Sequence, residues 1–159
     1  MEAPRLNPFK AAPKAYQAMA GLQAYVNSCG LEAPLMELVK MRASQINGCA
    51  YCLDMHSKDA RAAGETEQRL YLLDAWREAA MYSERERAAL EWTEALTKIT
   101  EGHVPDEVYQ RAKAQFSDEE LANLSLVIVT INGWNRLSIA FRAQAGTYQP
   151  RAAQAKSGA

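Results

Sequence analysis

Apolar residues recur at helical spacing along most of the chain, whereas the strict alternation typical of strands hardly occurs. Within residues 11–27 the apolar side chains fall three or four positions apart, and Gly30 follows as a stop signal. A second helical pattern begins behind Pro34 and continues until Asn47 and Gly48 interrupt it. These patterns predict two helices that are joined by a short connection.

Three further helices are predicted in the middle of the chain. Residues 49–63 continue the helical pattern, and the apolar positions within residues 70–76 suit a short helix. Ser83 and Glu86 then have the spacing of a capping box, in which each side chain binds the backbone N–H of the other residue. This box predicts the start of a helix that ends before Gly102.

The longest apolar segment, residues 121–141, follows a second capping box formed by Ser117 and Glu120. The β-branched run at residues 127–131 would suit a strand if it stood alone. The capped start, and the length of the segment before Gly146, favour a buried helix instead. We therefore predict an all-α protein, a single-domain helical bundle of about six to eight helices.

The size and composition of the chain suit one domain. With 159 residues, of which 48% are apolar, the chain can bury roughly 70% of the surface that it exposes when unfolded. We assign residues 1–149 to this domain. Residues 150–159 lack large apolar side chains and are predicted to form a flexible tail.

Charge and cysteine usage narrow the choice of partners and compartment. The 18 Lys and Arg residues nearly balance the 19 Asp and Glu residues, so we expect neither nucleic acid nor a membrane surface as a partner. No apolar run has the length of a signal-peptide core or of a membrane span. Two of the three cysteines are spaced C-x-x-C, which is typical of redox or metal chemistry in a reducing compartment. These features predict a cytoplasmic protein.

The segment that contains the two closely spaced cysteines carries the candidate chemistry. In a helix, Cys49, Cys52 and His56 would occupy positions i, i+3 and i+7, which places two thiols and an imidazole on one face. The start of this helix would favour a thiolate at Cys49, and the imidazole could take the proton of Cys52, so either thiol could ionise first. Glu37 could orient His56 if the helices on either side of the break at Gly48 pack antiparallel.

The same residues allow two other interpretations. Cys49, Cys52 and His56, with Glu37 as a fourth ligand, would complete a zinc site, although three ligands on one helix face are unusual for structural zinc. The two thiols could also form a buried, inert pair.

Longer motifs indicate a family. Glu37 directly precedes the segment at residues 38–49, Leu-Val-Lys-Met-Arg-Ala-Ser-Gln-Ile-Asn-Gly-Cys. This segment ends at the first cysteine of the C-x-x-C pair, and Cys52 and His56 follow it. Residues 131–136 read Ile-Asn-Gly-Trp-Asn-Arg. Together these motifs resemble the alkylhydroperoxidase D-like branch of the carboxymuconolactone decarboxylase superfamily, and the resemblance spans about residues 7–145.

The resemblance implies an antioxidant thiol peroxidase, an alkyl hydroperoxide reductase that works without flavin, haem or metal and so without a cofactor. Cys52 would attack the hydroperoxide substrate and become a sulfenic acid, which Cys49 would resolve to a disulfide. His56 would be the base beside Cys52, and Glu37 would be the far end of a proton relay. An external dithiol, such as a lipoylated protein, would be the reductant.

One departure from the family pattern keeps other functions open. The best-known members place a relay histidine immediately before the attacking cysteine, whereas this chain has Tyr51, and a phenol is a poor base near neutrality. The first alternative is a decarboxylase that acts on a γ-lactone ring acid, which needs no C-x-x-C pair. The second is a non-enzymatic or metal-stabilised scaffold.

The apolar segment at residues 121–141 also bears on assembly. It is apolar on more than one helix face, which favours burial against another subunit as well as against the local core. The family resemblance implies a homo-oligomer, a trimer or a hexamer. Within this segment, Asn135 and Arg136 are interpreted either as residues that form hydrogen bonds across subunits or as residues exposed to solvent.

Overall fold

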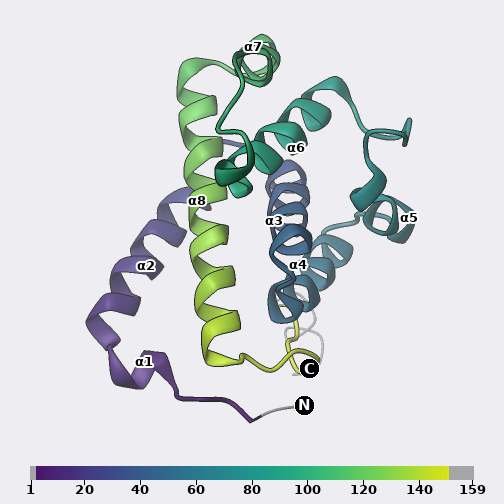
Figure 1. Cartoon of the computed structure of the whole chain (residues 1–159). Coiled ribbons are helices and arrows are strands. Elements are labelled where there is room, and N and C mark those ends of the chain that lie inside the picture. Colours follow the sequence, from purple (N-terminus) through teal and green to yellow (C-terminus); the bar gives the residue numbers. More distant parts are fainter. Residues whose placement is uncertain (1–2, 151–159) are drawn as a thin grey trace.

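Helix α8 (Asp118–Phe141) runs through the middle of the computed structural model, which describes residues 3–150 (Figure 1). It packs against α2 (Pro13–Val26) on one side and against α3 (Ala33–Asn47) and α6 (Glu84–Thr97) on the other. Both predicted capping boxes are present, one at the start of α6 and one at the start of α8. The two boxes therefore mark the beginnings of two of the helices that form the core.

The remaining elements are also helical, so the prediction of an all-α fold is confirmed for the described residues. They are α1 (Pro8–Ala11), α4 (Ala50–Ala62), α5 (Glu67–Tyr71), the 3₁₀ turns η1 (Leu73–Ala75) and η2 (Ile99–Glu101), and α7 (Asp106–Gln115). The predicted flexible tail, residues 150–159, lies outside the described residues except for Pro150.

Two details differ from the sequence-based prediction. Helix α1 was not predicted, because four residues are too few to show a helical period; it is started by the Asn7 side chain, which accepts a hydrogen bond from the Lys10 N–H. Helix α8 ends with Phe141, the last residue of the predicted apolar segment, but its C-cap is Arg142 rather than the expected stop at Gly146. Arg142 adopts a left-handed conformation with φ 57°, and its N–H binds the last turn of α8.

The connection between α3 and α4 places the dithiol segment. Gly48 ends α3 in a left-handed conformation with φ 67°, which favours glycine because it has no side chain to clash with the backbone. The Cys49 N–H then donates to the Ser44 carbonyl oxygen, and the chain turns directly into α4. Helices α3 and α4 pack against each other, as the predicted short connection requires.

The core is divided among three groups of buried residues. A large group joins α2, α3, α6, α7 and α8, and a second joins α3 to the segment between α4 and α6. The third is small and consists of Ala43, Cys49, Cys52 and Ile131, with Tyr51 packed against it. The two cysteines therefore lie where α3, α4 and α8 meet.

Among the described residues, α8 is the one helix long and apolar enough to cross a membrane on the criteria of length and composition. The same criteria are met by core helices of soluble proteins, and α8 begins with three acidic residues and packs against five other helices. We therefore interpret α8 as the central core helix. Its outer face still leaves Leu126, Val129 and Ile139 exposed.

Candidate active site

The two thiols of the C-x-x-C motif lie in direct contact. The spacing predicted that Cys49 is part of the helix, but Cys49 is the N-cap residue of α4 and has an extended backbone. Its Sγ nevertheless lies 2.8 Å from the Sγ of Cys52. Each cysteine is only 1% exposed, and the two are not joined by a disulfide. The Cys52 side chain lines a cavity, whereas Cys49 is not among the residues that line it.

The contact between the thiols makes their proton affinities very different. The hydrogen bond donated by Cys52 lowers the pKa of Cys49 to about 7, against the opposing effect of burial. The same hydrogen bond, followed by burial and by the charge on Cys49, raises the pKa of Cys52 above its ordinary value. The first proton of the pair is therefore lost near neutral pH, and the ionised pair holds the remaining proton between two sulfur atoms.

Glu37 and His56 form the second part of the site. The Nδ1 atom of His56 lies 2.9 Å from Oε2 of Glu37, and the other carboxylate oxygen of Glu37 accepts from the Lys40 ammonium at 2.8 Å. Burial raises the pKa of Glu37, but the hydrogen bonds and charges of His56 and Lys40 outweigh it, and the net effect lowers the pKa.

An ionised Glu37 determines which nitrogen of His56 carries the proton. A carboxylate can only accept, so Nδ1 must donate, and in the neutral ring Nε2 is then left as the proton acceptor. In the described part of the chain no hydrogen bond joins His56 to Cys52. The two side chains lie one helical turn apart on α4 and line the same cavity, so a substrate or a water molecule can connect them.

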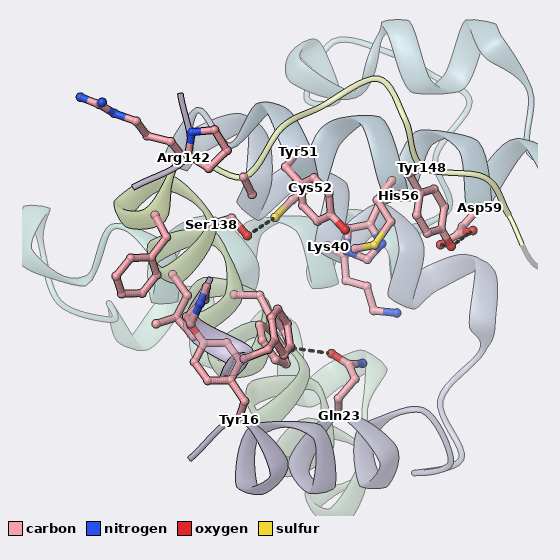
Figure 2. Close-up of a pocket in the computed structure, with 18 of the residues that line it drawn as sticks. Tyr16, Gln23, Lys40, Tyr51, Cys52, His56, Asp59, Ser138, Arg142 and Tyr148 are labelled. Atoms are coloured by element: carbon pink, nitrogen blue, oxygen red, sulfur yellow. Dashed lines mark hydrogen bonds between the residues drawn. The ribbon is translucent and has the colours of Figure 1, made fainter. Parts of the chain in front are cut away.

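The cavity has a volume of about 860 Å³ and two different walls. In Figure 2, Tyr16 lies on one side of Cys52, whereas His56, Asp59 and Tyr148 lie on the other. The apolar wall comes from the N-terminal segment, α2 and α8, and it consists of Leu6, Pro8, Phe9, Tyr16, Trp134, Leu137 and Phe141. Cys52 is thus reached through a space large enough for an organic molecule.

The four residues considered for zinc do not converge on one point. Among the described residues, the group close enough to share a metal ion is Glu37, His56 and Asp59, and it does not include the cysteines. These three side chains already have partners, because Lys40 binds Glu37 and the Tyr148 hydroxyl donates to Asp59 at 2.8 Å. The geometry therefore favours a proton relay over a C-x-x-C zinc site.

The interpretation of Asn135 as a residue bonded across subunits or exposed to solvent is wrong. Asn135 is neither exposed nor left for a partner subunit: its side chain is 0% exposed and forms hydrogen bonds with Asn47 and Ser44 inside the chain. A signal was present, because positions 124, 128, 131, 135 and 138 follow one helix face, and the first three are buried apolar residues. That face carries Asn135 and Ser138 to the dithiol.

Comparison with known proteins agrees with this arrangement. Residues 11–95 match the carboxymuconolactone decarboxylase family, and the chain belongs to that family, in its alkylhydroperoxidase D-like branch. The chain is 45% identical over 136 residues to the uncharacterised protein YdfG of Bacillus subtilis. The aligned residues make up 86% of this chain and 92% of YdfG.

Two solved structures show the same fold. The crystal structure of a protein of unknown function from Agrobacterium tumefaciens, provisionally named as the antioxidant defence protein AhpD, has a TM-score of 0.89 and 45% identity, covering 92% of this chain and 100% of that one. The debrominase Bmp8 has a TM-score of 0.75 and 21% identity, covering 92% of this chain and 77% of its own. At that identity, the likeness to Bmp8 concerns the fold alone.

Proposed function

We propose that this protein is a thiol peroxidase that reduces organic hydroperoxides through a Cys49–Cys52 dithiol–disulfide cycle. The observation that carries the proposal is the contact between the two sulfur atoms, at 2.8 Å, beside a cavity that also contains the Glu37–His56 pair. Two thiols at this distance can close into a disulfide after a small rotation. A lowered thiol pKa supplies the thiolate that such chemistry needs.

The proposed cycle consists of two reactions at the thiol pair and one external reduction. His56 first takes a proton from the thiol pair. The Cys52 thiolate then attacks the outer oxygen of the hydroperoxide, an S–O bond forms, the O–O bond breaks, and His56 returns the proton to the leaving alkoxide, which departs as an alcohol. Cys49 next attacks the sulfur of the Cys52 sulfenic acid: the S–S bond forms, the S–O bond breaks, and the departing hydroxide takes the Cys49 proton and leaves as water. An external dithiol, such as a lipoylated protein, returns two electrons and two protons.

Cys52 is assigned the attacking role because of its position. Its side chain lines the cavity, whereas Cys49 is buried and is not part of the cavity wall. Although the lower pKa belongs to Cys49, a proton moving across the short contact transfers the charge to Cys52. The sulfur that meets the substrate can thus be the ionised one without the movement of any backbone.

The test is the loss of free thiols when the reduced protein receives one equivalent of cumene hydroperoxide. We expect two thiols to disappear and one intramolecular disulfide to form between Cys49 and Cys52, which peptide mapping by mass spectrometry identifies. Cys29 should remain free, because it lies apart from the pair. A lactone decarboxylase or a scaffold would leave all three thiols unreacted, and that result would reject the peroxidase proposal.

We also propose that the active protein is a homo-oligomer. The support is the exposed apolar face of α8, formed by Leu126, Val129 and Ile139, which a second copy could cover. Light scattering coupled to size-exclusion chromatography should give a mass several times that of one 17.6 kDa chain. A mass of one chain at micromolar concentration would contradict this proposal and would leave the dithiol chemistry untouched.

A further inference from the structure

The part of α8 that lies behind the dithiol presents two neutral polar side chains to it. Asn135 is buried beside the small group that contains both cysteines, and Ser138 follows one turn later. We propose that Asn135 and Ser138 form a thiolate cradle, two hydrogen-bond donors that stabilise the negative charge on the Cys49–Cys52 pair. The inference rests on the proposed dithiol function and assigns a role to residues outside the C-x-x-C motif and its histidine.

The network around Asn135 determines the orientation of its amide. The Ser44 hydroxyl donates to the Lys40 carbonyl oxygen at 2.7 Å, so towards Asn135 it can only accept. The Asn135 Nδ2 therefore faces Ser44, at 3.1 Å, and its Oδ1 accepts from the Asn47 Nδ2 at 2.9 Å. If the amide were flipped, the Asn135 oxygen would face the accepting Ser44 oxygen, and the Asn135 nitrogen would face the donating Asn47 nitrogen.

This orientation leaves one N–H of Asn135 for the sulfur atoms. An amide nitrogen has two hydrogens, and Ser44 uses one of them. The second is available to the thiol pair, and the hydrogen bond from Asn135 lowers the pKa of both Cys49 and Cys52. A donor held on two sides by other side chains cannot turn away when the charge moves between the sulfurs.

Ser138 provides the second donor, directly at the attacking sulfur. Its Oγ lies 3.8 Å from the Sγ of Cys52, and Figure 2 shows this contact between α4 and α8 at the edge of the cavity. In the dithiol the Cys49 S–H can donate to Cys52, and the Cys52 S–H can donate to the hydroxyl oxygen. Once Cys52 is a thiolate, the hydroxyl can rotate and donate instead, because a serine O–H is both donor and acceptor.

The cradle offsets the cost of forming a thiolate at this buried site. Burial disfavours the charged form of a thiol, and both cysteines are almost fully buried. The adjacent Tyr51 packs against the pair but is a phenol rather than a cation. Neutral donors that are already in place offset the burial without the cost of moving solvent or side chains during the reaction.

The test is a pH titration of thiolate absorbance in the reduced Asn135→Ala and Ser138→Ala variants. For each variant we expect the first midpoint to rise by about one pH unit, since a thiolate is favoured by each hydrogen bond it accepts. Alkylation by iodoacetamide should become about fivefold slower at about pH 7, and nearly equal to that of the wild type at about pH 10, where the thiol ionises in either protein.

Matched controls separate the cradle from general destabilisation. Asn123→Ala removes another buried asparagine of α8, whose amide binds Tyr25 and Cys29 far from the dithiol. Ser57→Ala removes a serine hydroxyl from α4 that binds only the helix backbone. Both controls should keep the wild-type midpoint, whatever they do to the melting temperature.

The outcomes distinguish the cradle from the peroxidase proposal. If the wild type forms the disulfide with hydroperoxide but Asn135→Ala and Ser138→Ala keep its midpoint, the cradle is rejected and the peroxidase stands. If the midpoints rise but the wild type does not react with hydroperoxide, the cradle stands and the peroxidase is rejected. Should Asn135→Ala fail to fold, Ser138→Ala decides alone, because its side chain is only partly buried and its loss removes no core volume.

Discussion

Replacement of Cys52 by serine is expected to reduce hydroperoxide consumption to the background rate. The Cys52→Ser variant keeps Cys49, but that thiol is buried and does not line the cavity, so the substrate cannot reach it. It also loses the thiol whose hydrogen bond lowers the pKa of Cys49. The new serine hydroxyl can replace this hydrogen bond only in part. The consumption of cumene hydroperoxide, followed with a dithiol reductant in excess, measures the effect.

The partner variant, Cys49→Ser, should behave differently. Its Cys52 still faces the cavity and can be oxidised once, but the sulfenic acid then has no neighbouring thiol to resolve it. A sulfenic-acid trapping reagent such as dimedone should therefore label Cys49→Ser at position 52 and leave Cys52→Ser unlabelled. Cys29→Ser is the matched control and should react as the wild type does. Full turnover by Cys52→Ser would overturn the assignment of the attacking thiol.

Replacement of His56 by alanine is expected to slow the first oxidation by about a hundredfold near neutral pH, the usual scale for loss of a positioned acid–base group. His56 is the ring that Glu37 holds through Nδ1, so its Nε2 is free to exchange protons with groups in the cavity. Glu37→Gln should have a smaller effect in the same direction. It removes the carboxylate that orients the ring through Nδ1 but leaves the ring in place.

The pH dependence of this effect separates two roles of His56. Rates of thiol loss should be measured in single-turnover experiments from about pH 6 to about pH 10, because the thiols ionise without help at the upper end. A gap that closes with rising pH identifies His56 as a proton-transfer group. A gap that persists to about pH 10 identifies a positioning role instead, because an ordinary imidazole is neutral at that pH and cannot act as an acid. His103→Ala, which removes the exposed second histidine, is the control. A wild-type rate for His56→Ala near neutral pH would exclude the relay.

The helices could be predicted from the sequence because their signals are local. The apolar spacing in α2, α3 and α8 and the two capping boxes depend on residues within one or two turns of each other. The errors have equally local causes. Helix α1 is too short to show a period, and the end of α8 depends on a left-handed Arg142, a conformation for which arginine carries no sequence signal.

The candidate site divides in the same way. The sequence alone shows that two thiols and an imidazole lie within two helical turns. Residues three or four positions apart, such as Cys49 and Cys52 or Cys52 and His56, are neighbours on the surface of a helix. The family motifs, and with them the family itself, could also be read from the chain. The contact of Glu37 with His56 followed only if α3 and α4 packed together.

Only the tertiary structure decided which sulfur faces the cavity and what stabilises its charge. Ser138 lies 86 positions from Cys52 in the sequence, and Asn135 lies 91 from Ser44, so their contacts depend on how α8 packs against α3 and α4. Burial, which opposes the thiolate, and the donors that offset it are likewise set by that packing. The reacting groups are thus local to one helix, whereas their proton affinities belong to the whole bundle.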